Sequence, residues 1–259
     1  KGTSTSLPSP RLHLVGDSTM ADKMNLAYPE RGWGQLLPEF MLAKLTIINH
    51  AANGRSTLRF LNEGRWQMLL DELQAGDYVL IQFGHNDEKA EDPTRYNEPQ
   101  RAFPQWLARY VALAREKGAT PILVTPVARR KFDHGQLLDT HGLYAQAVRD
   151  LASRENVGLI DLTALSMDWL RAAGDEGARG AEPTVTRFSD DAAEAAAVAE
   201  SIARRIAELQ GGGSGAQVAA EGLTRDVAVF DRSMNGLRNG GGDIARVTAA
   251  GAVGPLNQA

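Results

Sequence analysis

The amino-terminal part of the chain contains the stretch Leu12-His13-Leu14-Val15-Gly16-Asp17-Ser18-Thr19, in which a short apolar run stops at a glycine and an acidic residue and then presents a hydroxyl. A second apolar run, Asp77-Tyr78-Val79-Leu80-Ile81-Gln82-Phe83, leads directly into the polar cluster Gly84-His85-Asn86-Asp87. Short apolar runs rich in branched residues indicate buried strands. The two segments therefore predict two strands whose polar ends contribute to one site.

The same strand signal recurs along the chain and alternates with helical periodicity. Strands are expected at residues 12–15, 45–48, 78–83, 121–125 and 157–162, and helices at residues 33–42, 57–73, 104–117, 142–154 and 189–209. Such alternation is typical of a parallel sheet that carries helices on its faces. We therefore predict an α/β fold with a central parallel sheet of about five strands.

Composition divides the chain into three parts. Residues 1–10 form a flexible lead-in rich in Ser, Thr and Pro, such as often follows a removed export signal, so we expect a secreted or periplasmic protein. Residues 11–210 are predicted to form the main domain. Residues 211–259 begin with a glycine-rich linker and contain one apolar patch, so we expect a tail that is disordered or loosely docked.

Overall composition excludes several functional classes. With 259 residues and 43% hydrophobic content the chain can bury a substantial core. A formal charge of −4 gives no extended basic face, so nucleic acid is not an expected partner. No run approaches the roughly 18 apolar residues of a membrane span, so no membrane partner is expected either. The absence of cysteine excludes disulfides, thiolate metal sites and a cysteine nucleophile.

Polar residues collect where the predicted strands end, which is where ligands bind in open parallel sheets. These residues are Ser18 after the first strand, residues 49–54 after the second, 84–87 after the third, 129–131 after the fourth and Asp161 at the end of the fifth. A serine in a strand-to-helix turn offers both its hydroxyl and its N–H, and a glycine N–H with an asparagine amide can complete a three-donor oxyanion hole. Gly54 and Asn86 are placed to do this with Ser18.

Structural roles compete with functional ones for several of these residues. We expect Asp17 to hydrogen-bond turn amides and Asp87 to cap a helix or brace a loop, in preference to direct catalysis. Trp33 and Trp66 could stack on a sugar, but core packing is the favoured role. Residues 129–131, Arg-Arg-Lys, could bind an acidic substrate, although a solvated basic loop is the default.

Three separated motifs carry a resemblance to a known family: Gly16-Asp17-Ser18-Thr19, Asn53-Gly54-Arg55-Ser56 and Gly84-His85-Asn86-Asp87. Together they resemble the first three sequence blocks of the SGNH (GDSL-like) hydrolase superfamily. The stretches Arg31-Gly32-Trp33-Gly34-Gln35 and Glu63-Gly64-Arg65-Trp66 look more narrowly like rhamnogalacturonan acetylesterases.

The resemblance covers about residues 12–209 and implies a fold, an activity and a site. It implies a flavodoxin-like three-layer α/β/α sandwich that removes acetyl groups from plant cell-wall polysaccharide. Ser18 would be the nucleophile, and the N–H groups of Ser18 and Gly54 and the side chain of Asn86 would be the oxyanion donors. The expected partner is an acetylated polysaccharide or oligosaccharide, and the chemistry uses no metal and no cofactor.

The fourth block departs from the family pattern. Relatives carry Asp-x-x-His before the last helix, usually followed by Phe-Ser, and the histidine is the general base. Here Phe188-Ser189 is preceded by Thr184-Val185-Thr186-Arg187, so Thr184 stands at the aspartate position and Arg187 at the histidine position. Arginine cannot deprotonate serine because its pKa stays above about 12. Loss of a triad base can lower turnover by roughly a million-fold.

The chain has five histidines that could be considered as substitute bases. His13 lies on the first strand about 16 Å from the serine at about 3.3 Å per residue, so it is excluded. His50 and His85 sit at neighbouring strand ends, where structural hydrogen bonding is the favoured role. His134 and His141 lie on the loop after the fourth strand, which borders the same edge of the sheet.

Three hypotheses follow. The first is a carbohydrate O-acetylesterase that works through an acetyl-enzyme on Ser18. The second is a catalytically impaired relative that binds acetylated polysaccharide, since both Thr184 and Arg187 depart from the family pattern. The third is a carboxy-terminal region altered relative to that of a functional parent, which the glycine tract would fit.

Overall fold

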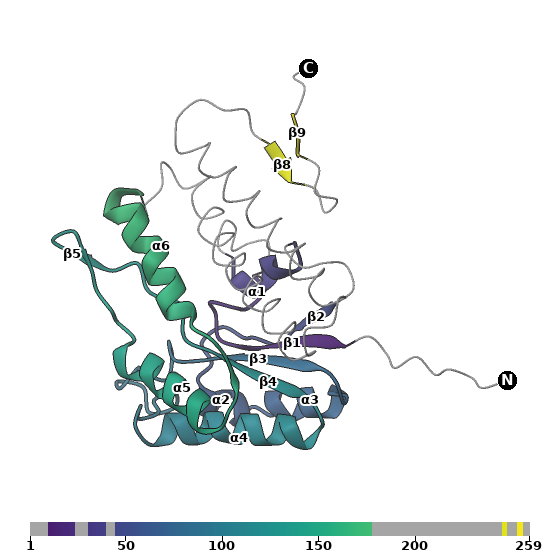
Figure 1. Ribbon diagram of the computed structural model, residues 1–259. Coiled ribbons are helices and arrows are strands. Elements are labelled where there is room, and N and C mark those ends of the chain that lie inside the picture. The colour runs from purple at the N-terminus through teal and green to yellow at the C-terminus, as the bar shows by residue number, and fades with distance from the viewer. Residues whose placement is uncertain (1–9, 24–30, 40–44, 178–244, 248–252, 256–259) are drawn as a thin grey trace. The chain divides into compact units, whose positions relative to one another are not determined.

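The computed structural model describes residues 10–23, 31–39, 45–177, 245–247 and 253–255 (Figure 1). Within these residues the chain divides into two compact units, which are described separately. The first unit takes its described residues from 1–21, 43–126 and 141–159, and the second from 22–42, 127–140 and 160–259. The helix expected at 189–209 lies outside the described residues, as do Thr184 and Arg187.

A five-stranded sheet forms the centre of the fold. Its strands are β1 (Arg11–Gly16), β2 (Thr46–Asn49), β3 (Tyr78–Gln82), β4 (Thr120–Val124) and β7 (Gly158–Ile160), in the spatial order β2-β1-β3-β4-β7. The pairs β1–β2, β1–β3 and β3–β4 are parallel. Counted among these five strands alone, the order is 2-1-3-4-5, which is the flavodoxin-like order. The predicted α/β class and parallel sheet are confirmed.

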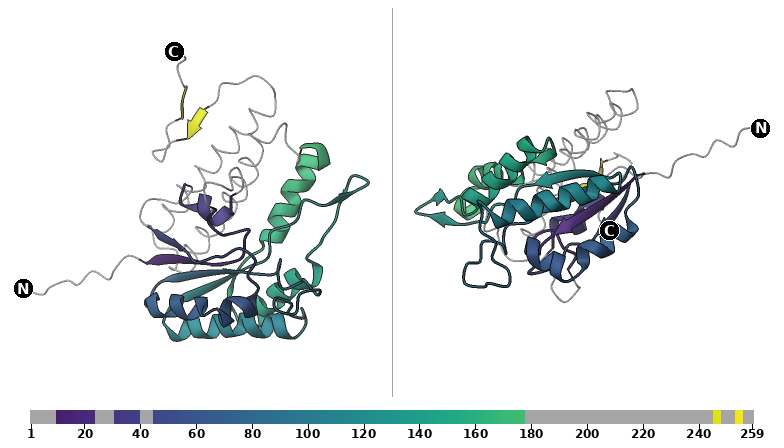
Figure 2. Two further views of the ribbon diagram at one scale, coloured as in Figure 1. Left: turned by 180° about the vertical axis from the view of Figure 1, so that it is seen from behind. Right: turned by 90° about the horizontal axis from the view of Figure 1, so that it is seen from below.

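Four helices of the first unit lie together on one face of the sheet in Figure 1 and again in the reverse view of Figure 2. They are α2 (Thr57–Asn62), α3 (Arg65–Glu72), α4 (Ala102–Glu116) and α5 (Gly142–Arg154). Apolar side chains from these helices and from alternate strand positions such as Val79 and Ile81 form one buried core. Removing apolar surface from water at about 25 cal/mol per Å² supplies the main force that holds helices and sheet together.

Helices α2 and α3 replace the single helix expected over residues 57–73. Gly64, the residue before α3, has φ 72° and ψ 6°, a left-handed conformation that cannot continue a right-handed helix. Ser56 caps α2, because its side chain accepts a hydrogen bond from Arg59 N at 3.3 Å. The chain therefore turns at Gly64 and presents Glu63 and Arg65 on either side of the turn.

An aromatic cluster centred on Tyr110 packs beneath the loops that follow β2 and β3. The centroid of the Tyr110 ring lies 4.4 Å from that of the Trp66 ring and 5.7 Å from that of the Phe83 ring. The Tyr110 hydroxyl donates to the carbonyl of Thr57 at 2.8 Å, which satisfies the buried polar end of the ring. Trp66 is 2% exposed and Trp33 is 1% exposed, so both tryptophans are core residues and neither is a sugar platform.

The second unit contains one helix within the expected range 33–42 and several elements that periodicity alone did not indicate. It includes the helix α1 (Trp33–Leu36), followed by a 3₁₀ turn over Leu37–Glu39, and the longer helix α6 (Leu162–Gly177). Two short antiparallel pairs also belong to it, β5 (Phe132–Asp133) with β6 (Gln136–Leu137), and β8 (Ala245–Val247) with β9 (Val253–Pro255). None of the described helices is long and apolar enough to span a membrane.

The basic triplet at residues 129–131 lies in this second unit, beside the β5–β6 hairpin. Arg129 Nη1 donates to Thr140 Oγ1 at 3.4 Å, and Arg130 forms an ion pair with Asp175. The guanidinium of Arg130 also lies over the ring of Phe132 at 5.8 Å. Intramolecular contacts therefore engage both arginines, so the triplet is more than a freely solvated loop.

Candidate active site

The turn that carries Ser18 is braced by its neighbours. The buried carboxylate of Asp17 accepts hydrogen bonds from Thr19 N at 2.9 Å and Thr19 Oγ1 at 2.8 Å. Gln82 Nε2, at the end of β3, donates to Thr19 Oγ1 at 2.6 Å. Ser18 is half-buried, and its hydroxyl hydrogen-bonds to no other described residue. The turn is therefore braced on both sides of Ser18, while the serine hydroxyl itself is not used in these hydrogen bonds.

Close packing at Gly16 brings this turn against the end of β3. Gly16 is paired in register with Gln82, and a Cβ at position 16 would lie 2.7 Å from the Gln82 carbonyl oxygen. It would also lie 3.0 Å from the Sδ of Met20. The backbone of Gln82 cannot retreat without breaking the β1–β3 ladder, so only glycine fits here.

The loop after β2 continues to follow the end of β1. His50 N donates to the Leu14 carbonyl at 2.9 Å, and Ala52 N donates to the Gly16 carbonyl at 3.0 Å. This pairing carries the chain past the serine turn to Gly54, which has φ +76°. The loop with the predicted glycine donor is therefore hydrogen-bonded to β1, the strand that leads into the Ser18 turn.

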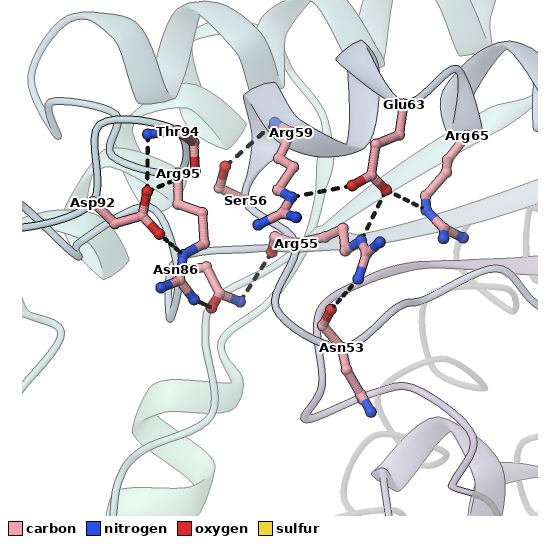
Figure 3. A network of polar contacts seen from close by, with 10 residues as sticks. All are labelled: Asn53, Arg55, Ser56, Arg59, Glu63, Arg65, Asn86, Asp92, Thr94 and Arg95. Carbon is pink, nitrogen blue, oxygen red and sulfur yellow. Dashed lines mark hydrogen bonds and ion pairs between the residues drawn. The ribbon is translucent and has the colours of Figure 1, made fainter.

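The side-chain amide of Asn86 is held from both ends, as Figure 3 shows. Its Nδ2 donates to the carbonyl of Arg55 at 3.0 Å, and its Oδ1 accepts from Arg95 Nη1 at 3.3 Å. Arg95 is held in turn by Asp92, whose Oδ2 accepts from Arg95 Nε at 2.5 Å. Because an arginine cannot accept and a carbonyl cannot donate, these partners fix which end of the amide is nitrogen. The second N–H of Nδ2 donates to no other described residue.

Asp87 ties the loop after β3 to the start of α2. Its Oδ1 accepts from Thr57 N at 3.0 Å, Thr57 Oγ1 at 2.5 Å and Asn97 Nδ2 at 2.8 Å. Burial, aided by the nearby charge of Asp17, raises the pKa of Asp87 to about 7 against the opposing effect of the hydrogen bonds from Thr57 and Asn97. Asp87 is fully buried and braces the loop, which is the structural role favoured for it.

The structure therefore joins the three loops that carry Ser18, Gly54 and Asn86 through direct hydrogen bonds between backbone and side-chain groups. A hydroxyl, a left-handed glycine and an oriented amide lie on neighbouring loops at the carboxyl ends of β1, β2 and β3. Such groups can attack an ester carbonyl and stabilise the oxyanion that forms.

His50 is engaged with a second histidine. Its Nε2 lies 3.0 Å from His13 Nδ1, the two rings are stacked with centroids 5.2 Å apart, and His13 Nε2 lies 3.3 Å from Asp77 Oδ2. Burial and, to a smaller extent, the charge of the neighbouring His13 together lower the pKa of His50 to about 4. Asp77 precedes β3, so this network extends from the loop after β2 toward the amino ends of the strands.

The other candidate bases have different surroundings. His85 is half-buried and its ring lies 4.3 Å from that of His141, while His141 Nδ1 lies 3.1 Å from Glu88 Oε2. His134 is in the second unit, at the turn of the β5–β6 hairpin, with a side chain that is 96% exposed. Among residues 10–23, 31–39, 45–177 and the short β8–β9 ladder, no group of His, Asp and Glu is placed to hold a metal ion.

Two features of the site had no functional assignment at the level of sequence. Arg95 is one, since nothing in the sequence pairs it with Asn86. The other is a set of three arginines around Glu63, which we call the arginine cluster. Glu63 accepts from Arg55 Nε at 2.8 Å, Arg59 Nε at 3.1 Å and Arg65 Nε at 2.8 Å. The Arg59–Glu63 spacing of four residues on a helix is a readable signal, but the other two contacts depend on the turn at Gly64.

A flavodoxin-like sheet whose first strand leads into Gly-Asp-Ser, with a glycine loop and a Gly-x-Asn-Asp loop after the next two strands, is typical of the SGNH class of ester hydrolases. The chain belongs to the GDSL-like lipase/acylhydrolase family, which it matches over residues 14–191.

Individual relatives give the same result. The chain is 40% identical over 168 residues to the probable rhamnogalacturonan acetylesterase YesY of Bacillus subtilis, covering 64% of this chain and 76% of that protein. It is 41% identical over 167 residues to the rhamnogalacturonan acetylesterase RhgT of the same organism, covering 64% and 70% respectively.

Among solved structures, that of YxiM from Bacillus subtilis matches with a TM-score of 0.65 and 26% identity. The match covers 76% of this chain and 57% of that one, so this chain spans a little over half the length of YxiM.

Proposed function

We propose that the protein is a carbohydrate O-acetylesterase that removes acetyl groups from a rhamnogalacturonan-type polysaccharide. The observation that carries this proposal is the hydrogen-bonded meeting of the three loops in a chain whose relatives YesY and RhgT are named as rhamnogalacturonan acetylesterases. Family membership makes ester hydrolysis the reaction class, and the substrate is the part that needs a direct test.

In the proposed reaction, Ser18 Oγ attacks the acetyl carbonyl carbon and its proton passes to a base. The negative charge that develops on the carbonyl oxygen is stabilised by the N–H groups of Ser18 and Gly54 and by Asn86 Nδ2. The C–O bond to the sugar then breaks, and the sugar hydroxyl leaves with a proton. Water attacks the resulting acetyl-serine, releases acetate and restores the hydroxyl. Removing one oxyanion donor of this type lowers turnover by about 10²–10³-fold.

The base in this scheme is not assigned to a residue. The family position is occupied by Arg187, which cannot accept the proton, and Thr184 replaces the aspartate that would orient a histidine. This double departure favours a second candidate function, a catalytically impaired relative that retains the site and binds acetylated polysaccharide.

Acetate release from p-nitrophenyl acetate and from acetylated pectin distinguishes the two candidates. We expect the purified protein to release acetate and Ser18→Ala to abolish release. Ser153→Ala, which removes an exposed hydroxyl from α5, is the matched control and should behave as the original protein. Equal rates of acetate release from the original protein and from Ser18→Ala would reject the esterase function and favour the binding function.

Restoring the family pattern tests the role of the fourth block. The double variant Thr184→Asp/Arg187→His should raise the rate of acetate release well above that of the original protein, because it supplies a base and its orienting carboxylate. Adding Ser18→Ala to this variant should remove the gain. A double variant with no gain would contradict the idea that these two positions limit the reaction.

A further inference from the structure

The arginine cluster gathers more positive charge than it neutralises. Three guanidinium groups surround the single carboxylate of Glu63, and each of them binds it through Nε (Figure 3). The pKa of Glu63 is lowered to about 2, chiefly by the hydrogen bond from Arg55, so the carboxylate stays ionised and keeps the arginines in place. The result is a fixed cationic group with an excess of positive charge.

The terminal nitrogens of these arginines face outward from Glu63. Arg55 uses Nη1 to bind the Asn53 carbonyl at 2.6 Å, whereas the Nη groups of Arg59 and Arg65 bind no other described residue. The side chains of Arg59 and Arg65 are 40% and 38% exposed. A guanidinium held at Nε still presents two Nη donors in a plane, the arrangement that matches a carboxylate.

The arginine cluster is joined directly to the candidate oxyanion site. Arg55 follows Gly54 in the chain, and its carbonyl accepts the hydrogen bond from Asn86 Nδ2. A polymer whose acetyl group lies at Asn86 therefore extends within reach of cationic side chains on the same loop and on the helices that follow it, α2 and α3.

We propose that Arg55, Arg59 and Arg65, gathered by Glu63, form a subsite for the carboxylate of an acidic sugar unit in the same chain as the acetylated unit. This inference rests on the proposed function, because it assigns a place to the neighbouring unit of that substrate. The Nη groups of Arg59 and Arg65 are the principal donors to this carboxylate. The subsite gives the protein a preference for acetylated polyuronate over acetylated neutral polysaccharide.

The double variant Arg59→Gln/Arg65→Gln tests the subsite while leaving Arg55, which contacts Asn86, in place. Arg154→Gln is the matched control, because Arg154 also binds a glutamate through Nε and is 59% exposed. Arg154 ends α5 shortly before β7 begins, so it lies near the amino ends of the strands. Binding of unacetylated oligogalacturonate is measured by calorimetry at low and high salt, and acetate release is measured on acetylated polygalacturonate and acetylated xylan.

In the double variant we expect oligogalacturonate affinity to fall about tenfold at low salt, with much of the salt dependence lost. The ratio of kcat/KM on acetylated polygalacturonate to that on acetylated xylan should also fall about tenfold. Arg154→Gln should change neither quantity. Unchanged oligogalacturonate affinity in the double variant, or an equal loss in Arg154→Gln, would overturn the subsite.

The binding measurement separates this inference from the proposed function. Oligogalacturonate binding that depends on Arg59 and Arg65, in a protein that releases no acetate, supports the subsite and rejects the esterase. Acetate release that depends on Ser18, with oligogalacturonate binding unaffected by the double variant, supports the esterase and rejects the subsite. Circular dichroism of both variants verifies that each one is folded.

Discussion

Asn86 shows how a single amide can be positioned for one purpose. Its oxygen accepts from Arg95 and one of its N–H groups donates to the Arg55 carbonyl. These two contacts fix the plane of the amide and therefore the direction in which the remaining N–H points. Preorganised donors stabilise a developing oxyanion without reorganising during the reaction. Under the proposed function, Arg95 is a positioning residue that acts through Asn86.

Replacing Arg95 with methionine tests this role. Arg95→Met keeps most of the side-chain stem but removes the donor to Asn86 Oδ1, so we expect kcat to fall about tenfold with little change in KM, less than the 10²–10³-fold loss expected for Asn86→Ala. Steady-state kinetics on p-nitrophenyl acetate measure the effect. Arg109→Met, on an exposed arginine of α4, is the control. A kcat for Arg95→Met equal to that of the control would exclude the positioning role.

Asp87 predicts a pH dependence of stability. Because its pKa is raised from 3.8 to about 7, the folded protein holds a proton that the unfolded chain has lost, and the free energy of unfolding falls as pH rises from 4 to 7. Asp87→Asn keeps an oxygen for Thr57 and Asn97 and removes the titration. Urea unfolding of both proteins at pH 4.5, 6 and 7.5 should show the original protein losing stability relative to the variant, by on the order of a few kcal/mol. Parallel profiles would contradict the shift.

At the scale of elements, His13, His50 and Asp77 connect β1 to the segments flanking β2 and β3. Burial lowers the pKa values of both histidines, so protonation opposes folding. The stability contributed by the neutral His50 is present above pH 6.5 and is lost as pH falls toward 4.

His50→Gln should flatten this acid side of the stability profile. Between pH 6.5 and 4.5 we expect the original protein to lose about 1–2 kcal/mol relative to the variant, measured by urea unfolding. His134→Gln, on the exposed hairpin turn, should follow the original protein. If His50→Gln and the original protein lose stability equally, His50 does not titrate in this range.

The break between α2 and α3 is a second feature at this scale. Gly64→Ala places a Cβ on a residue with φ 72° where no atom lies within 4 Å, so the cost comes from the backbone alone. We expect a loss of about 1 kcal/mol in the free energy of unfolding. Gln67→Ala, exposed on α3, should change it by less than about 0.5 kcal/mol. A Gly64→Ala protein as stable as the original would show that the turn can relax.

At the scale of the whole molecule, the strands were predictable because each is a short apolar run, and β1, β3 and β4 are largely buried on both faces. The expected strand at 78–83 and the observed β3 at Tyr78–Gln82 differ by one residue. The helices at 142–154 and at α4 were predictable from their apolar periodicity. The expectation for residues 57–73 was wrong in one respect, since a periodic pattern continued across Gly64 even though the backbone there turned left-handed.

Contacts between distant residues account for what the sequence did not reveal. The motifs containing Ser18, Gly54 and Asn86 were recognisable, yet nothing in them indicates that the Arg55 carbonyl holds Asn86 or that Arg95 holds its other end. The helix α6 and the β5–β6 hairpin also escaped prediction, the hairpin because its strands have only two residues each. Local signals specify elements, whereas the geometry of the site depends on loops brought together by the sheet.

The close packing at Gly16 limits which mutations the chain can accept. Every missense change of a glycine codon adds at least a Cβ, and at this position that atom would meet the carbonyl of Gln82 at 2.7 Å. In a scan of all single substitutions across the chain, scored by folding yield, position 16 should therefore tolerate no replacement, not even alanine.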